Sequence, residues 1–435
     1  NSVNNMGNEK RNLRSNSSED SEAKKRKLSR PSEEKKPSKF KTPSRVNGLK
    51  LIPVEGTSKY PVEQDDTEDT EKPVANHIHF LNNFQRGFGK LSVIEQIAEQ
   101  MYTRDLRWFT IVMQVDTPEL RVSGMQWHPY IPNLLVSGGK SGLLQLHNAN
   151  DLSKLPEPKK KFDGIGPGGT IEAIRFNTKR GIEVCTASVD GTVSTYNFDK
   201  DLRSIIVKSS EPYRVWFCSV DVHSDGKGVY AGDNEGRLAI HHLDSGKTSY
   251  DLRIHKSKIK HLEFHPGNPN LMVTASLDKK VKLWDIRKLD NKYSYFDCLE
   301  HMSAVASATF SRTDGCRLLT TDLHDGLRVF KAPNWTLEHE IGHPHRCFQH
   351  MTNITASWHP ATDLFAIGRY PDPRFDRYDP GARCVDVYSA LSGKLHCQLM
   401  DSGKLLTSLS YFNSTGSMLA TATGRKINIW QCRRT

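Results

Sequence analysis

A pattern that recurs seven times between residues 105 and 435 constrains the fold of this chain more than any other feature. In each repeat an apolar residue is followed directly by a turn, and successive repeats lie roughly 42 to 54 residues apart, a period typical of four-stranded propeller blades. The repeats are marked by Trp127-His128-Pro129, Phe176-Asn177, Val222-His223, Phe264-His265-Pro266, Phe310-Ser311, Trp358-His359-Pro360 and Phe412-Asn413. We therefore predict seven blades.

The residues inside the repeats support this prediction. An apolar strand, a tight turn and a second strand follow the marks, as in residues 184–191 and 272–279, and the Asp and Gly of these turns suit hairpins. One repeat ends in Trp284-Asp285, the residue pair typical of WD repeats. Residues 108–115 are expected to pair with the last blade and close the ring. The sequence thus predicts an all-β, seven-bladed WD-repeat β-propeller over residues 105–435.

The first 72 residues differ in composition from the rest. Residues 1–50 hold 14 Lys and Arg against 6 Asp and Glu, a charge of +8, and residues 51–72 hold 2 against 7, a charge of −5. With few large apolar side chains, residues 1–72 are expected to form a disordered tail. Because the whole chain carries +11, the remainder carries +8. This favours a polyanionic partner, the alternative being a solubilising surface.

The tail contains the basic cluster Lys24-Lys25-Arg26-Lys27. A cluster of this density is a candidate for nuclear import or for nucleic-acid binding, the alternative being a solvated disordered run. We expect the protein to reside in the nucleus.

Residues 73–104 have the periodicity of two short helices. The apolar stripe of the first comprises Val74, Ile78, Leu81 and Phe84. The second is expected to begin at Ser92, and its stripe comprises Val93, Ile94, Ile97 and Met101. These stripes either pack on the β-domain of the same chain or fill the groove of a partner.

Motifs of enzymes find little support. Residues 164–169 match GxGxxG, but Pro167 lies within the match and no βαβ unit surrounds it, which favours a loop between blades. Eight scattered cysteines without metal-like spacing indicate reduced thiols, and no apolar run approaches membrane-spanning length. We expect a soluble intracellular protein that is not an enzyme and needs no cofactor.

The stretch from Gly342 to His350 is rich in histidine and allows three interpretations. A metal site would use His343, His345 and His350, yet no carboxylate or second thiol accompanies them, so no metal is expected. A polar loop between blades is the plainest interpretation.

The third interpretation is a hairpin that wedges between DNA bases. Phe348 would stack, Gln349 and His350 would fill the gap, and Arg346 would neutralise a phosphate. Residues 368–383 follow as a long loop rich in Arg and Tyr, which is either a tolerated insertion or a second binding loop.

Four segments, in this order along a propeller, resemble the small subunit of the UV-damaged DNA-binding complex. They are residues 164–169, 343–350, 358–360 and 368–373. The resemblance covers about residues 74–432 and implies that one face of the propeller grips duplex DNA.

The resemblance also implies how damage is recognised. The Phe348-Gln349-His350 hairpin is expected to enter the minor groove at the lesion while the damaged nucleotides are extruded. Because photodimers and abasic sites stack and pair poorly, unstacking them costs less than unstacking intact steps, which gives selectivity for damage and not for sequence. By position, the resemblance assigns phosphate contacts to Arg121, Lys140, Lys258 and Arg369, and a place near the lesion to Trp216.

The same resemblance implies a second partner, the large damage-binding subunit, which is the adaptor of a cullin–RING ubiquitin ligase. Residues 73–104 are expected to bind it through Ile78, Leu81, Phe84, Ile94 and Ile97, and Arg287 completes a Trp-Asp-x-Arg motif of such receptors. The implied function is damage recognition that initiates nucleotide excision repair, with chromatin and histones as expected ubiquitination targets. The alternative is a chromatin scaffold that binds a histone or other peptide in its central channel.

Overall fold

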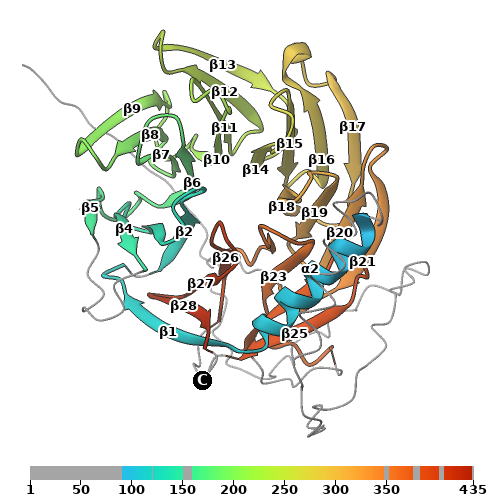
Figure 1. Ribbon diagram of the computed structural model, residues 1–435. Coiled ribbons are helices and arrows are strands. Elements are labelled where there is room, and N and C mark those ends of the chain that lie inside the picture. Colours follow the sequence, from blue (N-terminus) through green and yellow to red (C-terminus); the bar gives the residue numbers. More distant parts are fainter. Residues whose placement is uncertain are drawn as a thin grey trace, which may run out of the picture. The chain divides into compact units, whose positions relative to one another are not determined.

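The computed structural model describes residues 91–119, 121–149, 159–346, 352–375, 383–400 and 406–433. The chain divides into two compact units, Asn1–Leu49 and Lys50–Thr435, and all described residues belong to the second. Within that unit, seven antiparallel sheets of four strands surround a central channel (Figure 1). The predicted seven-bladed propeller is confirmed.

The strands follow one another blade by blade, from the innermost to the outermost. Blade 1 comprises β2 (Val122–Trp127), β3 (Leu134–Gly139), β4 (Leu144–Asn148) and β5 (Lys160–Phe162). Blade 2 comprises β6 (Ile171–Asn177), β7 (Glu183–Ser188), β8 (Thr192–Asn197) and β9 (Leu202–Lys208). Blade 3 comprises β10 (Phe217–Val222), β11 (Gly228–Asp233), β12 (Arg237–His242) and β13 (Lys247–Arg253). Blade 4 comprises β14 (Ile259–Phe264), β15 (Leu271–Ser276), β16 (Lys280–Asp285) and β17 (Tyr295–Glu300), with the 3-10 helix η1 (Ile286–Lys288) after β16.

The remaining blades repeat the arrangement. Blade 5 comprises β18 (Val305–Phe310), β19 (Arg317–Asp322), β20 (Gly326–Lys331) and β21 (Thr336–Gly342). Blade 6 comprises β22 (Ser357–Trp358), β23 (Leu364–Gly368), β24 (Cys384–Ser389) and β25 (Leu395–Met400). Blade 7 comprises β26 (Leu409–Phe412), β27 (Met418–Thr423) and β28 (Lys426–Cys432), and its outermost strand is β1 (Phe109–Asp116).

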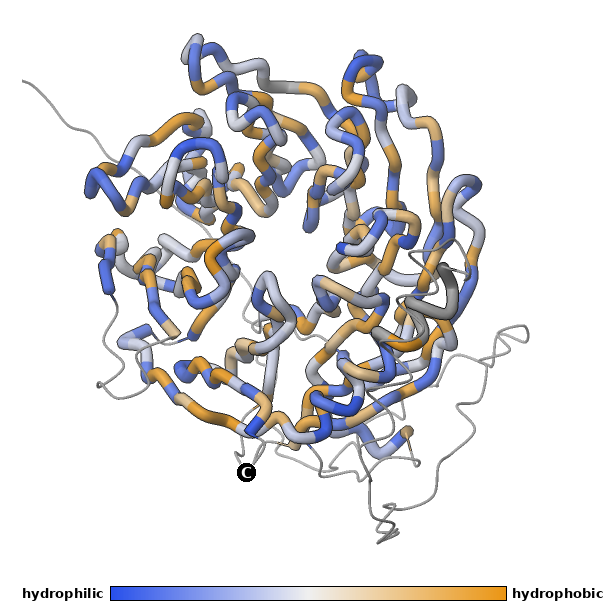
Figure 2. The backbone as a smooth tube through the Cα atoms, viewed as in Figure 1, coloured by the Kyte–Doolittle hydropathy of each residue, from blue (hydrophilic) through white to orange (hydrophobic). Residues whose placement is uncertain are grey.

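The seven marks of the sequence pattern occupy one structural position. Each mark falls at the end of an innermost strand, as Trp127 does in β2 and Phe310 in β18. The innermost strands of neighbouring blades contact one another around the ring, and β26 meets β2 to complete it. Apolar side chains pack between adjacent blades, and hydrophobic segments recur in every blade (Figure 2). The period of the pattern therefore reflects the interblade core.

Blade 4 shows how the Trp-Asp pattern stabilises a blade. The buried Trp284 indole donates to Thr274 Oγ1 at 2.8 Å, and the same oxygen lies 2.8 Å from His255 Nε2. The other ring nitrogen of His255 contacts the Asp278 carboxylate at 3.0 Å. This chain of hydrogen bonds satisfies buried polar groups and links β15 and β16 to the connection before β14 and to the turn that precedes β16.

The ring closes where the sequence predicted, through residues near the start of the repeat region. β1 pairs antiparallel with β28, from Phe109 opposite Cys432 to Asp116 opposite Lys426. Thr117 and Val122 extend the pairing by donating their backbone N–H groups to the carbonyls of Arg425 and Gly424.

The helix α2 (Leu91–Leu106) precedes β1 and lies over the outer part of blade 6 (Figure 1). It begins one residue before the predicted Ser92 and continues past the expected boundary at residue 104, because Leu106 is buried in the core of blades 6 and 7. No described helix combines the length and the apolar character needed to span a membrane.

Because several histidines are buried, we predict that the free energy of unfolding depends on pH. Burial lowers the pKa of five described histidines to about 4: His147, His261, His301, His343 and His359. Between about pH 6.5 and pH 4 the unfolded chain therefore binds more protons than the folded chain. The free energy of unfolding consequently decreases as the pH is lowered through this range. Asp221, whose pKa burial raises to about 6, and Asp363, whose pKa burial also raises, oppose this trend.

We expect urea denaturation to give a lower free energy of unfolding at pH 5 than at pH 7. Each histidine contributes up to about 1.4 kcal/mol per pH unit within the titration range. A free energy of unfolding that is constant or higher at pH 5 would contradict this expectation.

Candidate nucleic-acid interface

The antiparallel blades divide the ring into two faces. Every innermost strand begins at one face, which we call the entry face, and ends at the other, the exit face. Connections between blades, and those between second and third strands, lie on the entry face. The six described residues predicted to contact DNA all lie in or beside such connections: Arg121, Lys140, Trp216, Lys258, Arg346 and Arg369.

Lys258 belongs to a compact group of charged and aromatic side chains on the entry face. Its ammonium lies 5.5 Å from the ring centroid of Trp216, so the two predicted residues meet in a cation–π contact. Its Nζ atom also lies 3.9 Å from Glu172 Oε2, and Lys260 Nζ lies 2.6 Å from the same oxygen. The side chains of Lys258 and Lys260 are each about one-fifth exposed, at 20% and 19%.

Glu172 organises these lysines. Burial alone would raise the pKa of its carboxyl group, but the charges of Lys260, Lys258 and Lys140 lower that pKa to about 2. Two ammonium groups thus contact one carboxylate and the charge of a third, Lys140, acts on it, which leaves a local excess of positive charge. Sequence reasoning missed Glu172 and Lys260, although Lys258 and Lys260 alternate as residues on one face of a strand do.

The innermost strands of several blades carry a β-bulge at the same position, near their first residues. In blades 1 to 5 the pairing of the innermost strand shifts register at its first residues, as between Phe217 and Ser219 or between Ile259 and His261. Such bulges bend the strand and redirect its side chains. They lie directly beside Arg121, Trp216 and Lys258, and Lys140 donates its backbone N–H to the Arg121 carbonyl at 3.3 Å.

A buried polar network lies where the predicted hairpin begins. Asp386 accepts from Arg369 Nε at 3.0 Å and contacts His343 Nε2 at 3.1 Å. His343 and His345 stack, and His345 Nε2 contacts the Asp322 carbonyl at 3.0 Å. Both histidines and Asp386 are fully buried. Burial lowers the pKa of both histidines, although Asp386 favours a charged His343, so the rings are neutral at pH 7.

The network changes the interpretation of Arg369. The sequence predicted a phosphate contact, but this side chain is only 2% exposed and forms a salt bridge with Asp386. If Arg369 left that salt bridge to reach a phosphate, the buried carboxylate of Asp386 would lose its ion-pair partner. The structure places Arg369 in a supporting position beneath the entry face, and Tyr370, its neighbour, donates its N–H to the Pro344 carbonyl at 2.8 Å.

The same network bears on the metal interpretation. The described residues contain no group of three or more His, Cys, Asp or Glu side chains placed to hold an ion. His343 and His345 hold the stem of the predicted hairpin instead.

The first part of the long loop lies beside that stem. Arg374 forms ion pairs with Asp372 at 2.5 Å and with Asp325 at 2.9 Å. Hydrogen bonding from Arg374, and more weakly the charge of Arg346, lowers the pKa of Asp372. Arg346 is exposed and is the last described residue before the hairpin tip.

Several predicted residues fall outside the described part of the chain. They are Phe348, Gln349 and His350 of the hairpin, Ile78, Leu81 and Phe84 of the first stripe, and Lys24, Lys25, Arg26 and Lys27 of the tail. Ile94 lies in α2, but its side chain is not described.

The exit face has a different character. Exposed large apolar side chains are distributed over this face in five of the blades: Trp108, Tyr130, Ile131, Leu202, Tyr293, Phe296 and Leu337. Arg287 follows β16 on this face and is 66% exposed, held by two hydrogen bonds to the Asp285 carboxylate at 2.9 and 2.7 Å. The hydrogen bonds from Arg287 lower the pKa of Asp285 to about 2.

The helix α2 also belongs to this side of the ring. Tyr102 packs edge-on against His359, with 4.4 Å between the ring centroids, and Glu99 Oε1 lies 3.1 Å from His396 Nε2. Met101, from the predicted apolar stripe, is 53% exposed, and Ile97 is half-buried. The described side chains of the helix therefore dock on the propeller through Glu99, Tyr102 and Leu106, while Met101 of the predicted stripe faces solvent.

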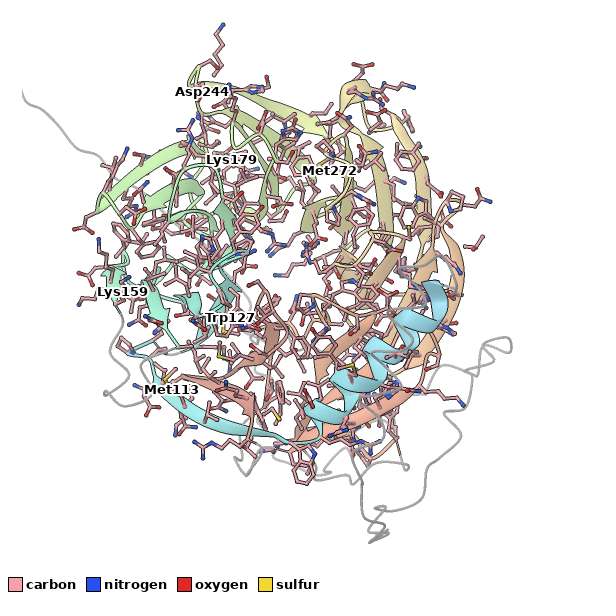
Figure 3. All side chains as sticks on the ribbon, in the orientation of Figure 1. Met113, Trp127, Lys159, Lys179, Asp244 and Met272 are labelled. Carbon is pink, nitrogen blue, oxygen red and sulfur yellow. The ribbon has the colours of Figure 1, made fainter. Side chains whose placement is uncertain are left out.

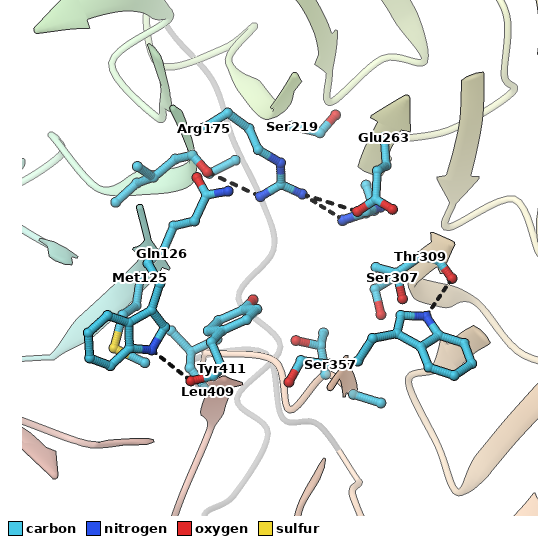
Figure 4. Close-up of a pocket in the computed structure, with 18 of the residues that line it drawn as sticks. Met125, Gln126, Arg175, Ser219, Glu263, Ser307, Thr309, Ser357, Leu409 and Tyr411 are labelled. Atoms are coloured by element: carbon cyan, nitrogen blue, oxygen red, sulfur yellow. Dashed lines mark hydrogen bonds and ion pairs between the residues drawn. The ribbon is translucent and has the colours of Figure 1, made fainter. Parts of the chain in front are cut away.

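The central channel has a volume of about 370 Å³ and is lined by paired charges. Arg175 reaches across it, with Nη2 3.0 Å from His261 Nε2 and 3.8 Å from Glu263 Oε2 (Figure 4). Arg312 contacts Glu263 at 3.0 Å. A peptide in the channel would meet these charge pairs, and the alternative of a channel-bound peptide stays a prediction.

Removing the Asp386 carboxylate should destabilise the protein strongly. Asp386→Ala leaves the buried Arg369 guanidinium without its ion-pair partner, and we expect a loss of about 3–5 kcal/mol in urea denaturation. The matched control is Asp244→Ala, in the turn after β12 (Figure 3), which removes an exposed carboxylate paired with Arg180 and should cost less than about 1 kcal/mol. Equal losses for the two variants would show that Asp386 is not central to the network.

Comparison with known proteins shows the family to which the chain belongs. Residues 246–285 match the family model of the WD domain, G-beta repeat. DNA damage-binding protein 2 of Mus musculus is 36% identical over 80% of this chain and 80% of its own length. The protein of that name from Bos taurus is 35% identical over 81% and 82%, and that from Gallus gallus is 34% identical over 81% and 70%. The chain therefore belongs to the family of DNA damage-binding protein 2, the small subunit of the UV-damaged DNA-binding complex.

Proposed function

We propose that this protein recognises damaged duplex DNA through its entry face and holds a protein partner at its exit face. The observation that carries the proposal is the contact of Lys258 and Lys260 with Glu172, with Trp216 beside Lys258 and the charge of Lys140 acting on the same carboxylate. Partly exposed ammonium groups next to an aromatic ring suit a DNA backbone with a displaced base. The names of the relatives point in the same direction.

For the mechanism, we propose that the Phe348-Gln349-His350 tip enters the minor groove and that the lesion is extruded. The buried His343 and His345 provide a rigid stem for such a tip, and the exposed Arg346 follows at its base. Insertion of such a tip is most favourable where unstacking the bases costs least. At photodimers and abasic sites this cost is lower than in intact DNA by a few kcal/mol. Damage recognition of this kind would initiate nucleotide excision repair.

The exit face supports the second part of the proposal. Its exposed apolar residues, together with Met101 of α2, suit a protein surface more than a polyanion. We propose that residues 73–104 and the Arg287 region bind the large damage-binding subunit, the adaptor of a cullin–RING ubiquitin ligase. The protein would then present chromatin and histones for ubiquitination in the nucleus, while transfer chemistry belongs to other subunits.

A charge reversal tests the DNA-binding face. Lys258→Glu places a second carboxylate beside Glu172, so we expect weaker binding to damaged and intact duplexes and a salt slope reduced by about one. Fluorescence anisotropy at fixed salt, with an abasic-site duplex and its intact counterpart, provides the measurement.

The control, Lys179→Glu, makes the same charge change in the exposed turn between β6 and β7 on the exit face (Figure 3). It should leave DNA binding unchanged. Equal affinity of the unaltered protein for both duplexes would refute damage recognition, and an unchanged Lys258→Glu variant would refute this site.

A second variant tests the protein-binding face. Met101→Glu puts a charge on the exposed side of α2 without touching the contacts of Tyr102 and Leu106, and should abolish co-purification with the large damage-binding subunit. DNA affinity should not change. Met302→Glu makes the same change at an exposed position outside residues 73–104, in the connection between β17 and β18, and is the control for charge alone. Retained co-purification of Met101→Glu would contradict binding through α2.

A further inference from the structure

Tyr213 has an unusual backbone and an unusual exposure for a tyrosine. It lies in the connection between β9 and β10, on the entry face, three residues before Trp216. Its side chain is 57% exposed, and its φ angle is 66°, in the left-handed region that bulky residues rarely adopt. Only three other described non-glycine residues have a positive φ angle: Asp201, Lys279 and Trp335.

The surrounding backbone holds Tyr213 in this conformation. The N–H groups of Arg214 and Val215 donate to the Glu211 carbonyl at 3.2 and 2.9 Å. Asn234 then fixes the end of the turn, since its Oδ1 accepts from the Trp216 N–H at 3.0 Å and its Nδ2 donates to the Arg214 carbonyl at 2.9 Å. Strained conformations held by several bonds concentrate at sites that contact ligands.

The ring of Tyr213 lies on the glycine-rich loop 164–169. A Cβ atom at Gly168 would come within 2.9 Å of Tyr213 Cε1, so only glycine leaves room for the ring there. The next glycine, Gly169, is covered in the same way by Ile165, whose side chain is itself 50% exposed. The glycines of the loop that matched a dinucleotide motif in the sequence thus leave room for two exposed apolar side chains, Tyr213 and Ile165.

This pair is continuous with the lysine group around Glu172. Thr170, directly after the loop, donates from Oγ1 to the Lys140 carbonyl at 3.1 Å. On the other side, Tyr213 shares its connection with Trp216, which contacts Lys258. An exposed aromatic ring therefore shares its connection with a residue that contacts an ammonium group, and aromatic rings combined with positive charge are what binds single-stranded nucleic acid.

We propose that Tyr213 is a stacking platform for an unpaired DNA base, with the loop 164–169 as its seat. Bases of an intact duplex are already stacked on both sides, whereas a base displaced or left unpaired at a lesion offers a bare face. Stacking accepts any base, so the platform adds affinity for damage without sequence preference. The proposal rests on the proposed DNA-binding function and adds a residue and a ligand class to it.

The test is binding of the full chain to an intact duplex and to the same duplex carrying an abasic-site analogue opposite a normal base. Tyr213→Ala should weaken binding to the abasic duplex about tenfold, within the range expected for loss of a base–aromatic stack, and leave the intact duplex almost unaffected. Tyr213→Phe and Tyr213→Trp should keep the affinity, because they keep the ring.

Two further variants separate stacking from folding and from general exposure. Tyr213→Gly removes the ring and relieves the positive φ angle, so its melting temperature should equal or exceed that of the unaltered protein while its binding falls as in Tyr213→Ala. Tyr293→Ala removes a tyrosine on the exit face that is 71% exposed and also has a lysine, Lys292, over its ring. It should leave both affinities unchanged.

Each outcome decides the proposal. If the alanine and glycine variants bind the abasic duplex normally, Tyr213 is no platform, although the proposed function stands as long as the unaltered protein prefers damage. If Tyr213→Phe loses as much as Tyr213→Ala, the phenol hydroxyl is responsible and stacking is refuted. If the unaltered protein binds both duplexes equally, the proposed function itself fails.

Discussion

The pairing of β1 with β28 is the interaction on which the rest of the structure depends. It joins residues more than 300 positions apart, from Phe109 opposite Cys432 to Asp116 opposite Lys426, and completes blade 7. Without it, β28 would present an unpaired edge, and blade 7 would lose its outer strand. The described entry-face residues between Arg121 and Arg383 lie within the span that this pairing closes, so their mutual positions require a closed ring.

Closure also explains why the sequence repeat and the structural blade are out of phase. The segment that matches the WD repeat, residues 246–285, includes the outermost strand of blade 3 and the first three strands of blade 4. Each repeat therefore ties two neighbouring blades covalently, and β1 provides the same tie between the two ends of the repeat region. A closed ring of this kind would suit the proposed deformation of DNA at a lesion, because the ring itself has no free edge to yield.

Alternation of antiparallel strands gives the ring two faces with different chemistry. The entry face carries lysines around Glu172 and aromatic residues at Trp216 and Tyr213, while the exit face carries most of the exposed apolar side chains. A polyanion and a protein partner therefore need not compete for one surface. The buried network of Asp386, Arg369 and His343 lies under the entry face and supports the loops that form it.

The seven blades, the closing strand, α2 and the entry-face location of the six described DNA-contact candidates were all predictable from the sequence, because period and strand order determine which connections share a face. The sequence alone did not separate Lys258 from Arg369: both are basic residues in entry-face connections. Only the tertiary structure separates them, because Asp386 of the neighbouring strand β24 contacts Arg369 in the interior and neutralises its guanidinium, whereas Lys258 stays partly exposed beside Trp216. Burial and pairing depend on residues brought together by folding, and a pattern along one strand does not contain them.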